Sequence, residues 1–189
     1  GKRLIDNYSY GSFTMTSKLK VNILADGGDN AILTSDGSGS LTLNNAALKM
    51  TPAFLAYKTS AQSISHATNT QLQYNVEAYD TDSAYDTSTY KFTVPSGAAG
   101  KYFFYANNGL ENTAPSRMLL RIRLNGSTDM AAVETGNAGN YSNICVSTTR
   151  TLSVGDYVDV TFYHDVGSTS NTTVGQDRFY FGGYKVIGA

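Results

Sequence analysis

The chain has 189 residues, a formal net charge of −1 and a sequence pI of about 6.1, and only 15% of its residues are charged. A chain with so weak an electrostatic field is not expected to bind nucleic acid or an anionic membrane surface. Its length suffices for one β-rich domain with a buried core, and no apolar run approaches the roughly 20 residues that a membrane-spanning helix needs. The single cysteine, Cys145, excludes an internal disulfide and a multi-cysteine metal site, and between Ile144 and Val146 it is expected to be a small hydrophobic residue of a strand.

Two patterns in the first 49 residues predict β-structure. In SFTMTSKLKVNIL, apolar and polar side chains alternate from residue 13, which predicts a half-buried strand over 13–24. The apolar face of this strand carries Phe13, Met15, Leu19, Val21 and Ile23. Two Asp-Gly turns follow, in ADGGDN and TSDGSG, and each leads into a short apolar segment, which predicts one or two small hairpins.

The apolar content of this region is too thin for an independent core, and a lone strand needs its apolar face and its edge covered. Residues 1–49 are therefore predicted to be an arm or stem that pairs with sister chains or anchors to a larger assembly. The alternative is that they add edge strands to their own domain.

From residue 50 onward, short strands recur between turn signals. The expected strands are 53–57, 70–76, 89–94, 101–107, 117–125, 144–147, 157–164 and 179–187. The longer loops are expected at 107–116, 130–140 and 167–177, and DMAAVET at 129–135 is the only stretch compatible with a helix. Eight strands without a convincing helix predict a sandwich of two antiparallel sheets.

Aromatic residues are densest in AYDTSTYKFTVPSGAAGKYFFYAN, residues 84–107. In KYFFYA, Tyr102 and Phe104 point to one side of the predicted strand, while Phe103 and Tyr105 point to the other. A solvated strand would not be apolar on both faces. We expect one face to be buried in the sandwich and the other against a neighbouring subunit or a loop.

The spacing of Tyr74, Asp80, Tyr85 and Phe92, followed by GKYFF at 100–104, resembles the signature of the C1q domain family. PAFLAY at 52–57, LNG at 124–126, VGDYVDV at 154–160 and FYFGGYKVIG at 179–188 are similar to the family in the same order, so the resemblance covers about residues 52–189. The chain departs from the family at Tyr74, where Phe is usual, in the longer SGAAG hairpin and at Ala106, where an aromatic is expected.

This resemblance implies an all-β, C1q/TNF-like jelly-roll head over residues 50–189 that assembles as a homotrimer, with the arm at 1–49. It also implies a set of residues that pack the core and the trimer. They are Tyr74, Tyr85, Phe92, Tyr102, Phe104, Val158, Val160, Phe181 and Tyr184.

Residues that could carry chemistry are few. Asp80, Asp82 and Asp86 have oxygen ligands that could hold Ca²⁺, although a solvated acidic loop is the alternative, and no other cofactor is expected. His66 and His164 are far apart, and His164 is expected to be partly exposed at a strand end. No nucleophile elbow is present, and no helix follows the glycine-rich DGGDN and DGSGS segments to hold a phosphate.

Arg121 and Arg123 share one face of the predicted strand 117–125, opposite Leu120, Ile122 and Leu124. They are expected to form solvated or intersubunit salt bridges, with an anionic ligand as the alternative.

A β-arm that leads into a C1q-like head, without a collagen repeat or coiled-coil stalk, resembles bacteriophage fibre, knob and capsid-decoration proteins. The prediction is a non-enzymatic protein of the virion surface. Its arm binds other virion proteins, and its trimeric head stabilises the particle or binds a host-surface glycan or protein, without nucleic-acid binding or membrane insertion. The alternative is a secreted cellular C1q-like or lectin-like recognition module. A glycan-degrading enzyme would need two carboxylates about 5–9.5 Å apart, and only the loop from Asp80 to Asp86 offers candidates.

Overall fold

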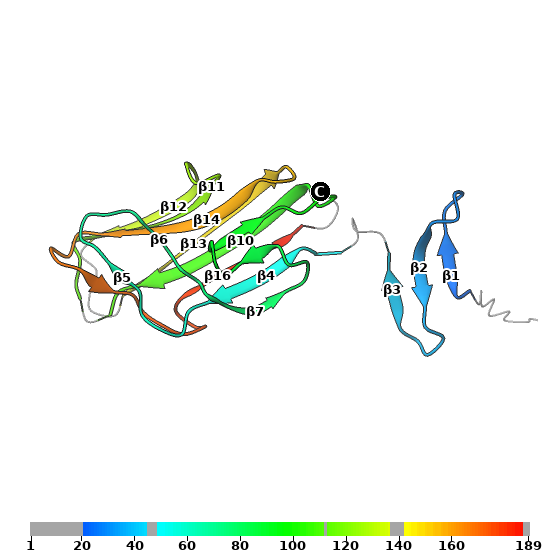
Figure 1. The fold of residues 1–189 in the computed structure, drawn as a ribbon, viewed down its shortest axis with the longest axis horizontal. Coiled ribbons are helices and arrows are strands. Elements are labelled where there is room, and N and C mark those ends of the chain that lie inside the picture. Colours follow the sequence, from blue (N-terminus) through cyan, green and yellow to red (C-terminus); the bar gives the residue numbers. More distant parts are fainter. Residues whose placement is uncertain (1–20, 45–48, 112, 137–141, 187–189) are drawn as a thin grey trace, which may run out of the picture. The chain divides into compact units, whose positions relative to one another are not determined.

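The computed structural model of this chain describes residues 21–44, 49–111, 113–136 and 142–186. All regular elements in these ranges are strands, which confirms the all-β prediction. Accordingly, these ranges contain no helix that could span a membrane. The contacts divide the chain into two compact units, Gly1–Asn44 and Asn45–Ala189, which we call the stem unit and the head (Figure 1).

The described part of the stem unit is a three-stranded antiparallel sheet of β1 (Ile23–Ala25), β2 (Ala31–Ser35) and β3 (Leu41–Leu43). Its two turns lie at the predicted Asp-Gly positions. Asp26 accepts hydrogen bonds from the backbone N–H groups of Gly28 and Asn30 at 2.8 and 3.0 Å. Asp36 caps the second turn in the same way. The two predicted hairpins thus share β2 and form one sheet.

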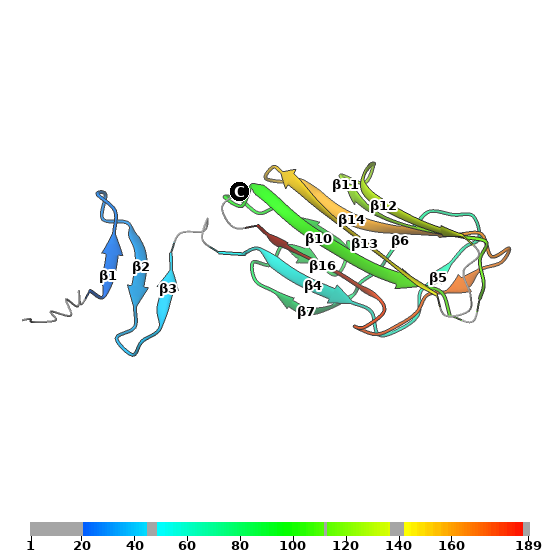
Figure 2. The ribbon, with the colours of Figure 1, turned by 180° about the vertical axis from the view of Figure 1, so that it is seen from behind.

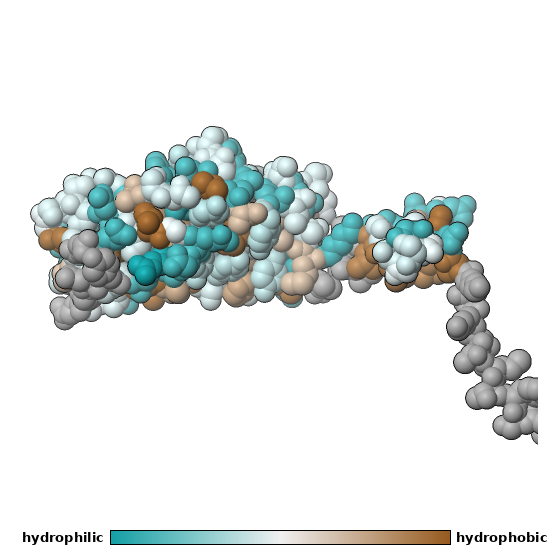
Figure 3. Space-filling model, turned by 90° about the horizontal axis from the view of Figure 1, so that it is seen from below, coloured by the Kyte–Doolittle hydropathy of each residue, from teal (hydrophilic) through white to brown (hydrophobic). Residues whose placement is uncertain are grey.

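The leucines of this sheet lie on one of its two faces. Leu24, Leu33 and Leu43 are paired across the three strands, and Leu41 lies on the same face because it is two residues from Leu43. The opposite face is mixed, because Thr34 is paired with Thr42 on one side and with Ile23 on the other. In Figure 3, hydrophobic atoms gather along one side of this sheet and hydrophilic atoms along the other. We call the side that carries the four leucines the leucine face.

The long strand predicted over 13–24 falls mainly outside the described residues, including Phe13, Met15 and Leu19. In the described part, Val21 precedes the first strand, which begins at Ile23. Both side chains are about half exposed, at 49% and 55%. Neither is covered by the described part of the stem unit.

The head contains two antiparallel sheets and a two-stranded ribbon. The five-stranded sheet has the order β13 (Asn143–Leu152), β10 (Gly100–Gly109), β16 (Tyr180–Lys185), β4 (Ala53–Tyr57) and β7 (Val76–Asp80). The six-stranded sheet has the order β12 (Thr128–Gly136), β11 (Arg117–Leu124), β14 (Tyr157–His164), β9 (Lys91–Thr93) and β8 (Tyr85–Asp86), and β6 (Thr70–Gln71) also pairs with β14. The ribbon joins β15 (Ser170–Asn171) to β5 (Ser63–Ile64). Figures 1 and 2 show β11, β12 and β14 in one layer and β10, β16 and β4 in the other.

Aromatic rings fill the space between the two sheets. The ring of Phe54 on β4 stacks on Tyr85 and Phe92 of the opposite sheet, with centroid distances of 5.0 and 5.1 Å. It also meets the ring of Phe181 edge-on at 4.9 Å. Further rings meet across the sheets where Phe92 contacts Tyr102 and Phe104. Because aromatic side chains bury the largest apolar areas, this cluster forms much of the contact between the two sheets.

Two strand predictions have the observed bounds, 53–57 for β4 and 157–164 for β14. The strand predicted over 70–76 is wrong, since β6 ends at Gln71 and β7 begins at Val76. The chain leaves the six-stranded sheet after β6 and joins the five-stranded sheet at β7. Leu72 and Tyr74 belong to no strand, but both are fully buried in this crossing. Because they are two residues apart, they gave the apolar alternation that is typical of a strand.

The loop predicted over 130–140, with its helix-compatible stretch, is wrong as far as Gly136, because β12 occupies this segment. Residues 137–141 lie outside the described residues. Met130 is the only residue of β12 in the buried class, while Ala131 and Val133 are partly buried and pack against the core. These small inward side chains give only a weak hydrophobic alternation. The loop predicted over 107–116 is also shorter, because β10 continues to Gly109 and Leu110 pairs with Thr172.

Candidate functional site: an aromatic sheet face

The outer face of the five-stranded sheet carries a continuous group of apolar and aromatic side chains. The ladder registers place them on one side, away from the core. The six that the following argument uses are Leu55, Tyr79, Phe103, Tyr105, Tyr180 and Tyr184, and Tyr57 and Lys101 lie on the same side of the sheet. We call these six residues the aromatic face.

The rings of the aromatic face contact one another across β10 and β16. Phe103 lies 5.5 Å from Tyr184 and 6.0 Å from Tyr105, and Tyr105 lies 6.0 Å from Tyr180, measured between ring centroids. Tyr105 is paired with Gly182, where an added Cβ would lie 2.5 Å from the tyrosine ring. Glycine is required here because only a residue without a side chain lets Tyr105 lie across β16.

A shallow pocket of about 170 Å³ opens on the aromatic face between Leu55, Tyr105, Gln176 and Tyr180. Burial raises the pKa of Tyr105 to about 12, and the neighbouring Tyr79 and Tyr180 add to the shift. The Tyr105 hydroxyl is therefore neutral at physiological pH. The six members are all uncharged residues, so repulsion between copies of this face could come only from charges at its border, such as the exposed Lys101 on the same side of β10.

Eight of the nine residues predicted to pack the core and the trimer are buried in the core, from Tyr74 to Phe181. The ninth, Tyr184, is half-buried and lies on the aromatic face. The sequence KYFFYA, apolar on both faces, had already predicted that Phe103 and Tyr105 belong to a second apolar face outside the sandwich. Leu55, Tyr79 and Tyr180 carried no such signal, because their partners across the ladder are far away in the sequence.

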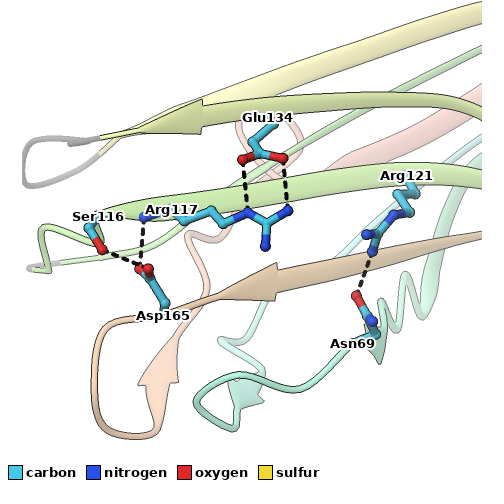
Figure 4. Close-up of polar contacts among 6 residues, drawn as sticks. All are labelled: Asn69, Ser116, Arg117, Arg121, Glu134 and Asp165. Carbon is cyan, nitrogen blue, oxygen red and sulfur yellow. Dashed lines mark hydrogen bonds and ion pairs between the residues drawn. The ribbon is translucent and has the colours of Figure 1, made fainter.

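The outer face of the six-stranded sheet is polar and carries arginines paired with carboxylates. Arg123 donates two hydrogen bonds to Asp159, at 3.0 and 2.7 Å, and the side chain of Asp159 is only 3% exposed. Arg117 donates two to Glu134, where both side chains are about half exposed (Figure 4). The expected solvated or intersubunit bridge is wrong for Arg123, since its partner lies on the adjacent strand of the same chain.

We expect Arg123→Met to destabilise the head by about 3 kcal/mol, the lower end of the range for breaking a buried ion pair, because Arg123 is itself partly exposed. The loss leaves the buried Asp159 carboxylate without its charged partner. Urea unfolding measures this change. The matched control, Arg117→Met, removes an exposed pair and should leave the unfolding midpoint unchanged. Equal effects of the two substitutions would contradict the expectation.

The three carboxylates predicted as calcium candidates are not brought together as a metal site. Asp80 accepts hydrogen bonds from the backbone N–H groups of Asp82 and Tyr85, at 3.2 and 2.8 Å. Asp86 caps a separate turn through Ser88 and Thr89. Across the described ranges, no three His, Cys, Asp or Glu side chains are grouped to hold a metal ion.

Hydrogen bonds from the Ser88 side chain and backbone, and from the Thr89 hydroxyl, lower the pKa of Asp86 to about 2. Because the folded pKa lies below the ordinary value of 3.8, this turn is stabilised above that pH, and the stabilisation is lost as the pH falls through about 2. Carbon-13 NMR of the side-chain carboxyls should give a midpoint of about 2 for Asp86. Ser88→Ala should move it upward, and an unmoved midpoint would contradict this assignment.

Two further predictions need correction. His164 is fully buried, with Nε2 3.0 Å from the carbonyl oxygen of Ile64 and Nδ1 accepting from the Val166 N–H at 3.2 Å. The predicted partial exposure of His164 is wrong because β5, which is distant in the sequence, covers the end of β14. Cys145 is exposed, because its neighbours Ile144 and Val146 occupy the inward positions of β13.

No known family model matches the chain, and no curated protein matches it in sequence. Solved structures do match its fold. The PRD1 vertex protein P5 is 14% identical with a TM-score of 0.58, over 73% of this chain and 99% of P5. Murine APRIL is 12% identical with a TM-score of 0.56, over 71% and 98%. The globular domain of the zebrafish complement 1qA protein is 18% identical with a TM-score of 0.50, over 71% and 97%.

The head has a C1q/TNF-like fold. All these identities are low, so the likeness of the C1q/TNF-like head to these structures concerns its fold alone. The jelly-roll prediction is thereby confirmed, with one sheet that bears the aromatic face and one sheet that bears the polar face.

Proposed function

We propose that this chain is a non-enzymatic structural protein of a bacteriophage particle. A trimeric C1q/TNF-like head is exposed on the virion surface, and the stem unit attaches it to the particle. The observation that carries the proposal is the union, in one chain, of a head with an uncharged aromatic face and a small sheet that has no core of its own.

The aromatic face supports the trimer. Large uncharged patches of tyrosine and phenylalanine are the composition found at the centres of protein interfaces. Three copies placed around one axis would cover the rings of Phe103, Tyr105 and Tyr184, which a solitary head leaves half-buried. A compact trimer would also supply stability to a chain that has no disulfide.

The leucine face supports attachment through the stem unit. Leu24, Leu41 and Leu43 are 47%, 67% and 37% exposed. A three-stranded sheet of this size needs its apolar face packed against another element to be stable. Sister chains and other virion proteins are the partners proposed for this face.

The fold likeness to the PRD1 vertex protein P5 supports the virion assignment. The likeness to the zebrafish complement 1qA domain favours a second candidate, a secreted recognition module of a cellular organism. The two candidates differ in where the protein is found.

Immunogold electron microscopy of particles from the source lysate tests the proposal, with an antibody raised against residues 52–189. Regular labelling over the capsid is expected for a decorating trimer, and labelling at the tips of tails or fibres is expected for an adhesin. Particles without label would overturn the virion assignment and favour the secreted module. Deleting residues 1–24 should abolish attachment to particles and leave the head folded.

A further inference from the structure

The polar face of the head contains a pocket of about 200 Å³ that the proposed function does not use. Its walls come from β11, β12, β14 and the segment before β6. The lining residues are Asn69, Arg121, Arg123, Ser127, Asp129 and Thr161. Figure 4 shows Arg121 reaching from β11 toward Asn69.

Protein contacts hold the two guanidinium groups of this pocket in place. Arg121 donates through Nη1 to Asn69 Oδ1, and its Nε lies 3.2 Å from Asp129 Oδ2. Arg123 is fixed through Nε and Nη2 by Asp159. Among the described residues, these contacts leave Arg121 Nη2, Arg123 Nη1 and Asn69 Nδ2 as donors for a ligand. Asp129 Oδ1 and the exposed Ser127 hydroxyl are available as acceptors.

The charges of the pocket balance, because each arginine is paired with one carboxylate. Asp129 is 49% exposed and would repel an anion that approached Arg121. A neutral ligand with several hydroxyl groups fits better, since each hydroxyl both donates and accepts and can bridge a guanidinium N–H and a carboxylate oxygen.

We propose that this pocket binds one neutral hexose or N-acetylhexosamine residue of a surface glycan. Its volume is below the roughly 300–1,000 Å³ of pockets for larger ligands, which limits it to a single sugar ring. The pocket is on the opposite sheet from the aromatic face, so it stays open when the head trimerises. The proposal goes beyond the assembly and attachment roles proposed above, and it rests on the proposed trimer and particle only for multivalency.

The affinity of one pocket is expected to be weak. The two outward tyrosines of β14 are already covered by cations. Lys91 Nζ lies 4.2 Å from the ring centroid of Tyr157, and the guanidinium of Arg117 lies 5.3 Å from that of Tyr163. Sugar binding must therefore depend on hydrogen bonds in the pocket without stacking on a free ring. Three heads in each proposed trimer, and many trimers on one particle, would raise the effective affinity for a glycan surface.

Saturation-transfer-difference NMR on the full chain tests the proposal. The probes are the methyl glycosides of glucose, galactose, mannose and N-acetylglucosamine, with N-acetylneuraminic acid as the anionic comparison. At least one neutral glycoside should receive saturation. Asp129→Asn should weaken its binding by about tenfold or more, as expected when a hydrogen bond to a charged group is lost.

Glu134→Gln is the matched control, because it also removes a β12 carboxylate that pairs with a β11 arginine but lies outside the pocket. It should leave the binding constant within about twofold, well under the tenfold change that one lost charged hydrogen bond produces. Should Asp129→Asn fold poorly in a thermal scan, Asn69→Ala replaces it, since Asn69 is exposed and precedes β6.

Three results would overturn the proposal: no saturation of any neutral glycoside, equal loss in the test and control variants, or binding of N-acetylneuraminic acid alone, which would make the pocket an anion site. Because this experiment uses isolated protein, it can fail while particles are still labelled by the antibody, or succeed when they are not. The two experiments therefore test the sugar site and the virion assignment separately.

Discussion

Replacing Phe103 with aspartate is expected to convert the proposed trimer of 20.3-kDa chains into monomers. Phe103 lies within the aromatic face, in contact with Tyr105 and Tyr184. In the proposed trimer, the substitution places three carboxylates near one axis with few polar partners, and burying a charge without a partner is costly. Sedimentation velocity or light scattering coupled to gel filtration gives the mass directly.

Tyr163→Asp is the matched control, because it places the same charge on the outer face of the other sheet, at a strand position that is also half-buried. It should leave the trimer intact. A wild-type chain that is monomeric at micromolar concentration would remove the aromatic face as a self-association surface. A Phe103→Asp protein that remains trimeric would place the trimer contacts on another surface.

Phe54→Ala is expected to lower the free energy of unfolding by about 3–5 kcal/mol, the range measured when a buried phenylalanine is truncated. Phe54 is fully buried and its ring contacts Tyr85, Phe92 and Phe181. The substitution leaves a cavity where the two sheets meet, and the surrounding rings belong to three different strands that cannot all move inward. Chemical unfolding followed by tyrosine fluorescence measures the loss.

Tyr163→Ala should change the stability by much less, because this ring is only half-buried on the outside of its sheet. Both proteins are compared at one chain concentration, since assembly adds to the apparent stability. If Phe54→Ala were as stable as Tyr163→Ala, the aromatic cluster would not be the centre of the core.

The two outer faces of the head suit different tasks. The aromatic face has no charged member and is suited to contact with copies of the same chain. The polar face carries three paired arginines and a small pocket, and it belongs to the other sheet. The stem unit adds the leucine face, whose proposed partners are sister chains or other proteins of the particle.

The alternation of side chains along single strands determined much of the fold in advance. Val158, Val160 and Phe162 were predicted to share one face of 157–164, and all three are buried in the core. The apolar character of both faces of KYFFYA likewise predicted that Phe103 and Tyr105 would need cover of their own. The inference for 157–164 is confirmed because the direction of a side chain in a strand depends only on its position in the chain. The cover expected for Phe103 and Tyr105 stays a prediction.

Tertiary structure alone decided the features that depend on a partner strand. β12 carries only a weak hydrophobic alternation, through Ala131 and Val133, and its pairing with β11 makes it a strand. His164 is buried because the distant Ile64 covers it, and Asp159 is ionically paired because the register sets it beside Arg123. The sequence by itself therefore determined an all-β chain with a sandwich of antiparallel sheets, since strand faces follow from local alternation. The two sheet faces and the polar pocket were decided only by long-range pairing, which brings together residues whose separation in the sequence carries no signal.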